Sequence, residues 1–171
     1  MRWLRRALNT AHIFLFTSEM PLWKYCLIAF PVALVPSIVL LGSVALVLGA
    51  LGVQVEILLP PETEVSVGAA FSAIVVAPLL ETPLLALLLP LLGKFSNRAG
   101  FVASASGLLW GIAHGVFGPL WFFGTAWSFF VMSCAFLHWR KQSFAQAFIA
   151  AAVPHALINF TMMFWGGCFD P

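Results

Sequence analysis

Charge is what this sequence has least of. Only 8% of its 171 residues are Asp, Glu, Lys or Arg, whereas a soluble domain carries about 25%. The chain is 62% hydrophobic, and its mean hydropathy is +1.02. This composition excludes an ordinary soluble fold and predicts an integral membrane protein whose length suits a single domain.

Several sequence patterns are also missing. The chain contains three cysteines without a C-x-x-C pattern, and the apolar context of Cys26 and Cys134 indicates small core residues. We find no nucleotide-binding loop, no basic patch for nucleic acid and no low-complexity run. We also find no internal repeat, which argues against a transporter, because many transporters are built from such repeats. The lipid bilayer is therefore an expected partner and nucleic acid is not.

Long apolar runs are abundant. Five runs, each close to the roughly 20 residues that cross a bilayer, cover residues 27–53, 67–92, 101–117, 120–137 and 144–165. Only Gly118 and Pro119 separate the third run from the fourth, which is typical of a tight helical hairpin. The predicted fold class is all-α: a polytopic membrane helical bundle of about five transmembrane helices, forming a single transmembrane domain at 21–171.

The few charged residues orient these helices. Lys and Arg occur before the first run, between the second and third, and between the fourth and fifth. The 54–66 loop holds three glutamates and no basic residue. This alternation follows the positive-inside rule and places the N-terminus in the cytoplasm. A bacterial inner membrane is favoured by the short length and the lack of targeting segments, and the endoplasmic reticulum is the alternative.

Two regions are expected at the membrane surface. Residues 1–20 combine apolar side chains with three arginines and predict an interfacial amphipathic helix, because their apolar stretch is too short for a signal peptide. His138 precedes Trp139, Arg140 and Lys141, which is typical of an interfacial position.

Three ionisable side chains lie inside the apolar runs: Glu81, His114 and His155. Such groups cost several kcal/mol in hydrocarbon unless they are paired or hydrated, so they usually face a cavity or one another. Each is roughly 20–24 Å along its helix from a basic loop, at 1.5 Å of rise per residue. If the basic loops share one side of the membrane, the three groups share one layer and form a candidate water-activating site.

The residues around these groups support a polar cavity. Pro78 and Pro83 flank Glu81, and each removes a helical hydrogen bond, which frees the carbonyls of Ile74 and Leu79. Irregular backbone at membrane depth is tolerated where it lines protein or water. The alternative is a protonated Glu81 bonded to a neighbouring helix.

Both histidines lie on helix faces with recognisable partners. Trp110 and His114 are four residues apart, beside a small-residue stripe formed by Gly107, Gly111 and Gly115 that lets another helix approach closely. His155 and Asn159 are also four apart, where they could donate hydrogen bonds to an oxyanion or join two helices.

Together these segments, within residues 67–165, resemble the CPBP family, which includes the CAAX prenyl proteases and the bacteriocin-processing and abortive-infection membrane proteins. The family's E-E-x-x-x-R motif aligns on Glu81, its aromatic-x-x-x-His motif on Trp110 to His114, and its His-x-x-x-Asn motif on His155 to Asn159. The first motif departs from the family pattern, because Thr82 replaces the second Glu and Ala86 replaces the Arg. Losing both charges together leaves no unpaired charge in the membrane.

The resemblance implies a helical intramembrane protease that acts on a peptide or membrane-protein substrate, of which a prenylated protein is one option. Glu81 and His114 would position a water, with Glu81 as general base. His155 and Asn159 would stabilise the oxyanion. A metal-free site is favoured; a zinc ion held by Glu81, His114 and His155 is the alternative. The competing function is a catalytically inactive relative that binds a peptide as an immunity or scaffold protein.

Overall fold

The computed structural model describes residues 10, 14–16, 19–60 and 66–166. All regular elements in this part of the chain are helices. Along the sequence they are α2 (Leu22–Ala50), the 3-10 helix η1 (Val55–Leu58), α3 (Val67–Phe71), the π-helix η2 (Ser72–Val76), α4 (Ala77–Gly93), α5 (Ala99–Gly115), α6 (Trp121–Trp139) and α7 (Phe144–Gly166).

Four helices are long and apolar enough to cross a membrane: α2, the continuous α3–η2–α4 helix, α6 and α7. This confirms the predicted all-helical fold and is compatible with an integral membrane protein. Helix α5, in the region of the third predicted span, has 17 residues and is not among the four. The count of about five therefore stays a prediction. The expected interfacial helix at 1–20 lies largely outside the described residues.

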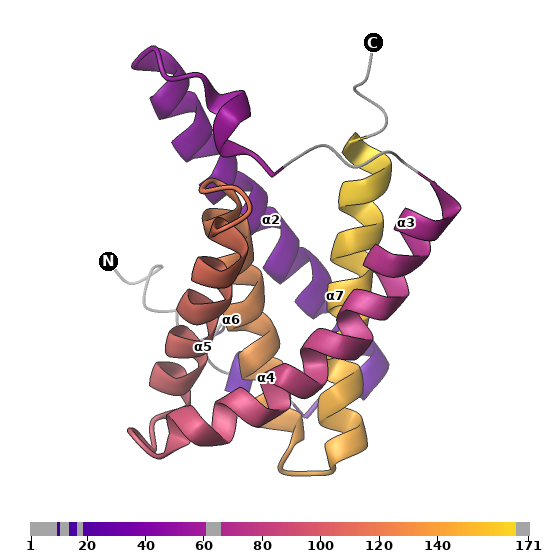
Figure 1. Cartoon of the computed structure of the whole chain (residues 1–171). Coiled ribbons are helices and arrows are strands. Elements are labelled where there is room, and N and C mark those ends of the chain that lie inside the picture. Colours follow the sequence, from indigo (N-terminus) through magenta and orange to yellow (C-terminus); the bar gives the residue numbers. More distant parts are fainter. Residues whose placement is uncertain (1–9, 11–13, 17–18, 61–65, 167–171) are drawn as a thin grey trace.

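The basic turns lie at one end of the bundle. The α4–α5 turn and the α6–α7 turn are together at the lower end of the molecule (Figure 1). The Tyr25 ring contacts the Trp139 ring edge-on at 5.6 Å, which brings the start of α2 to the same end. At the other end, the Leu120 N–H donates to the Leu58 carbonyl at 3.0 Å. The three basic segments therefore share one end, as the depth argument requires.

His138, predicted at the membrane interface, is buried within the protein at the basic end of the bundle. It is near the end of α6, but only 8% of its surface is exposed. Its Nδ1 is 2.9 Å from the Phe16 carbonyl oxygen, and its ring stacks on Tyr25 at 5.9 Å. The chain preceding α2 packs back onto this end of the bundle, and His138 is therefore an internal contact.

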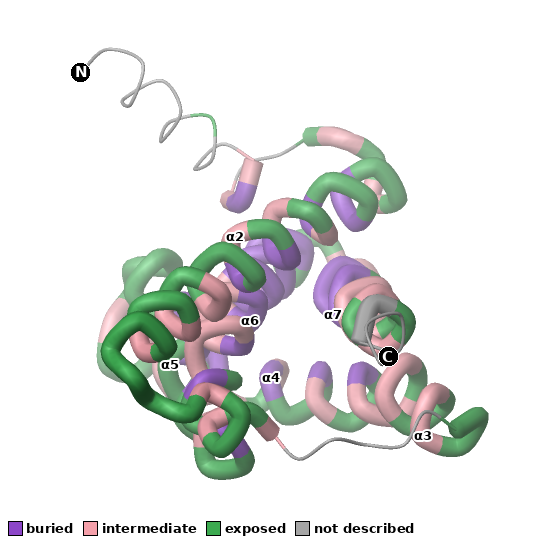
Figure 2. The backbone as a smooth tube through the Cα atoms, turned by 90° about the horizontal axis from the view of Figure 1, so that it is seen from above, coloured by how far each residue is buried: buried purple, intermediate pink, exposed green. Residues whose placement is uncertain are grey.

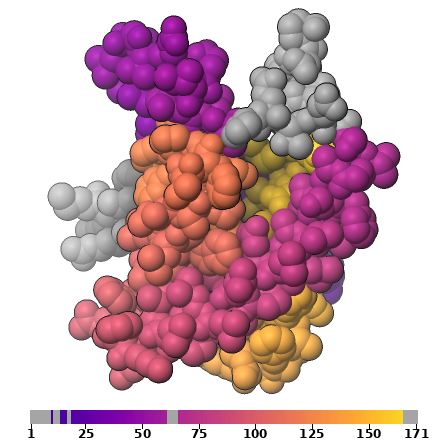
Figure 3. Space-filling view, viewed as in Figure 1, coloured from indigo at the N-terminus to yellow at the C-terminus, as the bar shows by residue number. Residues whose placement is uncertain are grey.

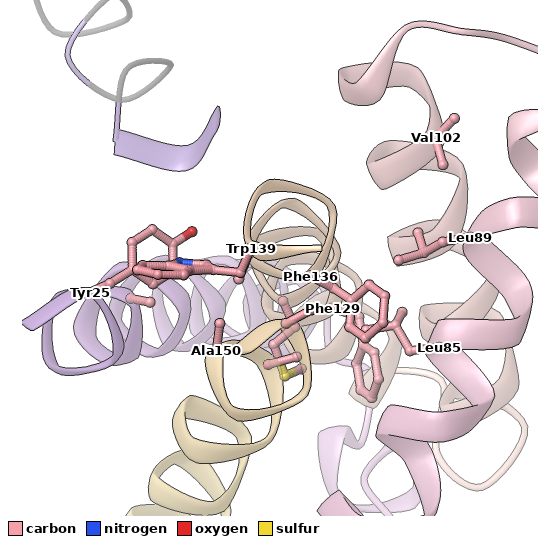
Figure 4. Packing of buried hydrophobic residues seen from close by; sticks show 13 residues of the cluster. Tyr25, Leu85, Leu89, Val102, Phe129, Phe136, Trp139 and Ala150 are labelled. Atoms are coloured by element: carbon pink, nitrogen blue, oxygen red, sulfur yellow. The ribbon is translucent and has the colours of Figure 1, made fainter. Parts of the chain in front are cut away.

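Helix α6 forms the centre of the bundle. Over half (56%) of its most apolar window is buried, against 17% for α2. Buried positions concentrate on α6 and on the sides of α2 and α7 that face it (Figure 2). The core around α6 draws side chains from five helices (Figure 4), including Tyr25, Leu85, Leu89, Val102, Phe129, Phe136, Trp139 and Ala150.

The predicted glycine stripe is the contact between α5 and α6. A Cβ at Gly107 would be 2.5 Å from the Ala126 carbonyl oxygen, and one at Gly111 would be 2.8 Å from the Ala126 Cβ. At Gly115 it would be 3.3 Å from the Phe122 Cβ. The two backbones therefore approach to a distance that only glycine permits at the first two positions, which confirms the small-residue interface.

A carbonyl freed by proline in α2 receives a donor from α6. Pro36 has no N–H to give to the Val32 carbonyl four residues earlier. The Trp127 Nε1–H donates to that oxygen at 2.9 Å. A side chain of one helix thus restores the hydrogen bond that proline removes from another.

Replacing Trp127 with Phe is expected to lower stability by about 1 kcal/mol, because the Val32 carbonyl would lose its donor in a medium without water. The measurement is the apparent melting temperature of the purified protein in detergent. Trp23→Phe is the matched control, since Trp23 is 61% exposed. Equal melting temperatures for the two variants would show that the Trp127 hydrogen bond contributes nothing.

Candidate functional site

Glu81 is on α4, immediately after an irregular turn. The π-helix η2 precedes α4, and the Ala77 N–H donates to the Ser72 carbonyl five residues earlier. In this pattern, the N–H of residue 78 would donate to the Ala73 carbonyl. Residue 78 is a proline, which has no N–H. The freed carbonyl is therefore that of Ala73, one residue before the predicted Ile74, because the π-turn shifts the acceptor by one position.

Asn159 on α7 supplies the missing donor. Its Nδ2 donates to the Ala73 carbonyl oxygen at 2.7 Å. This contact ties α7 to the turn that sets the orientation of Glu81, and it is the interhelical interaction left open as one interpretation of Asn159. The amide retains a second N–H that this contact does not use.

Asn159→Leu is expected to cost about 1–2 kcal/mol of stability, since it removes the donor to Ala73 while keeping a side chain of similar size. Melting temperature in detergent provides the readout. Thr161→Val is the control, because the Thr161 hydroxyl donates to the Leu157 carbonyl within α7 and joins no two helices. A loss no greater than that of the control would contradict the structural role of Asn159.

The central pair of the site joins α4 to α7. The His155 Nε2 is 3.8 Å from the Glu81 Oε2, and the two side chains are 8% and 21% exposed. This distance exceeds that of a direct hydrogen bond. The Glu81 Oε2 is itself buried and has no hydrogen-bond partner in the described part of the chain. The long α3–η2–α4 helix that carries Glu81 crosses the visible face of the molecule, in front of α7 (Figure 3).

His114 contacts the site through aromatic rings. Its Nδ1 is 2.9 Å from the Trp110 carbonyl oxygen of its own helix, and its ring meets Trp121 edge-on at 5.1 Å. No ion pair joins it to Glu81 within the described residues. Because a carbonyl oxygen only accepts, Nδ1 carries the proton and Nε2 of the neutral ring is an acceptor.

Phe129 on α6 connects the two histidines. Its ring centroid is 5.6 Å from that of His114 and 5.4 Å from that of His155, and it stacks on Trp110 at 4.4 Å. Both imidazoles therefore contact one aromatic side chain that is 3% exposed. The sequence offers no signal that separates Phe129 from the other aromatic residues of this region.

The two positions that depart from the family motif lie toward the protein interior. Thr82 is 3% exposed, and Ala86 packs in part against the main core cluster. Small or neutral side chains fit these places without an unpaired charge. The chain thus keeps one carboxylate in this helix, next to an imidazole.

A three-ligand metal group is not formed by the described residues: no three His, Cys, Asp or Glu side chains come together. Glu81 and His155 are a pair, whereas Nδ1 of His114 bonds to the carbonyl of Trp110 and its ring contacts Phe129. The Trp110 contact uses Nδ1 of His114 and leaves Nε2 with the lone pair that a zinc ion would need, so zinc stays the alternative.

Two pockets of the described structure lie away from Glu81, where the polar cavity is expected. A pocket of about 390 Å³ lies between α4, α5, α6 and α7 at the basic end. Another of about 320 Å³ lies between α2, α5 and α6. None of Glu81, His114 and His155 lines either pocket.

The arrangement can hold a proton or a water between a carboxylate and an imidazole at mid-bundle. It combines a buried acceptor oxygen, an imidazole within a water's reach of it, and a second imidazole that contacts the same aromatic ring as the first. Comparison of the chain with protein-family models, with curated proteins and with solved structures finds no match.

Proposed function

We propose that the protein is an intramembrane endopeptidase that hydrolyses a peptide bond in a membrane-associated or C-terminal substrate segment. One observation carries this proposal: the carboxylate of Glu81 and the imidazole of His155, from separate helices, are 3.8 Å apart. A water can hydrogen-bond to two groups at this spacing, since each contact needs about 2.8 Å.

The reaction follows from this pair. Glu81 acts as general base and takes a proton from the water as its oxygen attacks the carbonyl carbon of the scissile bond. The proton then passes to the leaving amine as the carbon–nitrogen bond breaks. His155 fixes the water beside the carboxylate, so that the attacking oxygen is held in one orientation.

Two further groups are available for the developing negative charge. Asn159, one turn after His155, retains one N–H beyond its contact with Ala73. His114 becomes a donor through Nε2 when protonated. Hydrogen-bond donors that are already in position before the reaction stabilise an oxyanion without a free-energy cost for reorienting them. In this proposal the chain's own residues are sufficient, and zinc is the alternative.

The proposed location is a bacterial inner membrane with the basic end in the cytoplasm. This orientation rests on the clustering of the α4–α5 and α6–α7 turns and the start of α2 at one end of the bundle. The N-terminus is then cytoplasmic, and the site lies within the bilayer.

A second candidate function is a binding protein of the same architecture that performs no chemistry, such as an immunity or scaffold protein. The contacts of Asn159 and His114 favour it, since both side chains bond to backbone carbonyls. Buried Thr82, in place of the family's second Glu, also favours it.

The test is a comparison of peptide termini in membranes from cells that express the wild-type protein or Glu81→Gln. New termini that depend on Glu81 support hydrolysis. If cells that express Glu81→Gln keep a phenotype that the wild-type protein confers, the result supports the binding function.

A further inference from the structure

The pocket of about 390 Å³ at the basic end is not lined by Glu81, His114 or His155. Its wall is apolar and includes Leu89, Val102 and Phe136. Its polar lining consists of Ser96 and Asn97 in the α4–α5 turn and of Arg140 after α6. The volume is within the range of about 300–1,000 Å³ that is typical of small-ligand sites.

The charge at this pocket is positive. Arg140 lies over the Phe144 ring, with its Cζ 5.7 Å from the centroid, and pairs with no acidic group among the described residues. Lys94 and Arg98 are in the same turn as Ser96 and Asn97. The first turn of α5 begins at the pocket and lacks a side-chain cap, which adds N–H donors there.

The pocket also borders the surface that meets lipid. On α4, beside the pocket, Leu87 and Leu91 are 67% and 52% exposed, and Phe144 on α7 is 50% exposed. Large apolar side chains at this exposure belong against acyl chains in a membrane protein. A ligand that enters here therefore meets hydrocarbon on one side and a basic turn on the other.

We propose that this pocket binds an anionic phospholipid. The phosphate is held by Arg140, Ser96 and Asn97, and the upper part of an acyl chain packs on Leu89, Val102 and Phe136. Basic pockets between transmembrane helices at the cytoplasmic face suit such headgroups. A free inorganic anion would leave the apolar wall uncovered, which is why the lipid fits better.

The experiment measures lipid binding to the full chain by native mass spectrometry in detergent. The probes are phosphatidylglycerol and phosphatidylcholine with the same acyl chains. Arg140→Gln is expected to lower the affinity for phosphatidylglycerol about five-fold and that for phosphatidylcholine by a smaller factor, because the choline cation already offsets the charge of the phosphate. Lys141→Gln is the matched control, because it removes the same charge from an exposed neighbour that does not line the pocket.

A second variant tests the space inside the pocket without changing its charge. Gly93 lines the pocket, and a Cβ there would meet no atom within 4 Å, so Gly93→Leu should fold and fill the space. It is expected to reduce phosphatidylglycerol binding without any change in charge. Equal losses for Arg140→Gln and Lys141→Gln would overturn the proposal, because binding would then follow surface charge. Competition by glycerol phosphate as effective as that by the lipid would overturn it as well.

Discussion

Glu81→Gln is expected to abolish the appearance of cleaved peptide termini, with a loss of about 100-fold or more in rate. The reason is that general-base catalysis contributes about 10²–10⁴-fold, and an amide cannot accept the proton of the attacking water. Gln keeps the size and polarity of the side chain, so the space beside His155 remains filled. The measurement is quantitative terminal-peptide analysis of membranes that contain equal amounts of each variant.

Glu56→Gln is the matched control for this prediction. Glu56 is exposed, in η1 at the far end of the bundle from the basic turns, and the substitution makes the same chemical change. It is expected to retain wild-type cleavage. If Glu81→Gln cleaves as well as Glu56→Gln, Glu81 is not the base. If neither variant nor the wild-type protein generates new termini, the binding function replaces the protease.

The same assay addresses the metal. In the metal-free mechanism, a zinc chelator leaves the wild-type cleavage rate unchanged, and purified protein contains no stoichiometric zinc. Inhibition by the chelator that added zinc reverses would instead favour a site in which His114 joins Glu81 and His155 as a ligand.

The sequence predicted that Glu81 and His155 share a layer, but it did not predict how the site is arranged. Counting residues from the basic loops placed Glu81 and His155 in one layer, and they are 3.8 Å apart. The same count placed His114 in that layer but could not give the rotation of its helix. The orientation of the His114 ring is set by its hydrogen bond to the Trp110 carbonyl. The spacing of residues in the sequence does not predict that hydrogen bond.

The π-turn is a second feature of the site that the sequence did not predict. An extra residue in one turn rotates the rest of the helix by about 100°, at 3.6 residues per turn. The two prolines around Glu81 were visible in the sequence, but the five-residue bond from Ala77 to Ser72 was not. The freed carbonyl and its partner Asn159 therefore emerge only from the packing of α7 on α4. Phe129 is similar, since its role depends on which rings surround it.

Gly107→Ala is expected to have the largest effect on stability, a loss of about 2–3 kcal/mol, because overpacking at a rigid contact forces the backbone to move. The added methyl would be 2.5 Å from the Ala126 carbonyl oxygen, a backbone atom that cannot rotate away. Helix α5 would have to retreat from α6 along the stripe. His114 is on the same helix, so its contact with Phe129 would loosen too.

The measurement is the apparent melting temperature in detergent, with Gly42→Ala as the control. Gly42 is also inside a long helix, but a Cβ there meets no atom within 4 Å, so alanine should be neutral or slightly stabilising through its higher helix propensity. Gly107→Ala melting at or above the control would mean that α5 and α6 do not approach this closely. Cleavage assayed below the melting temperature of Gly107→Ala then separates two roles of the interface. Activity that falls while the protein stays folded shows that the close approach of α5 to α6 positions His114, whereas unchanged activity limits the stripe to stability.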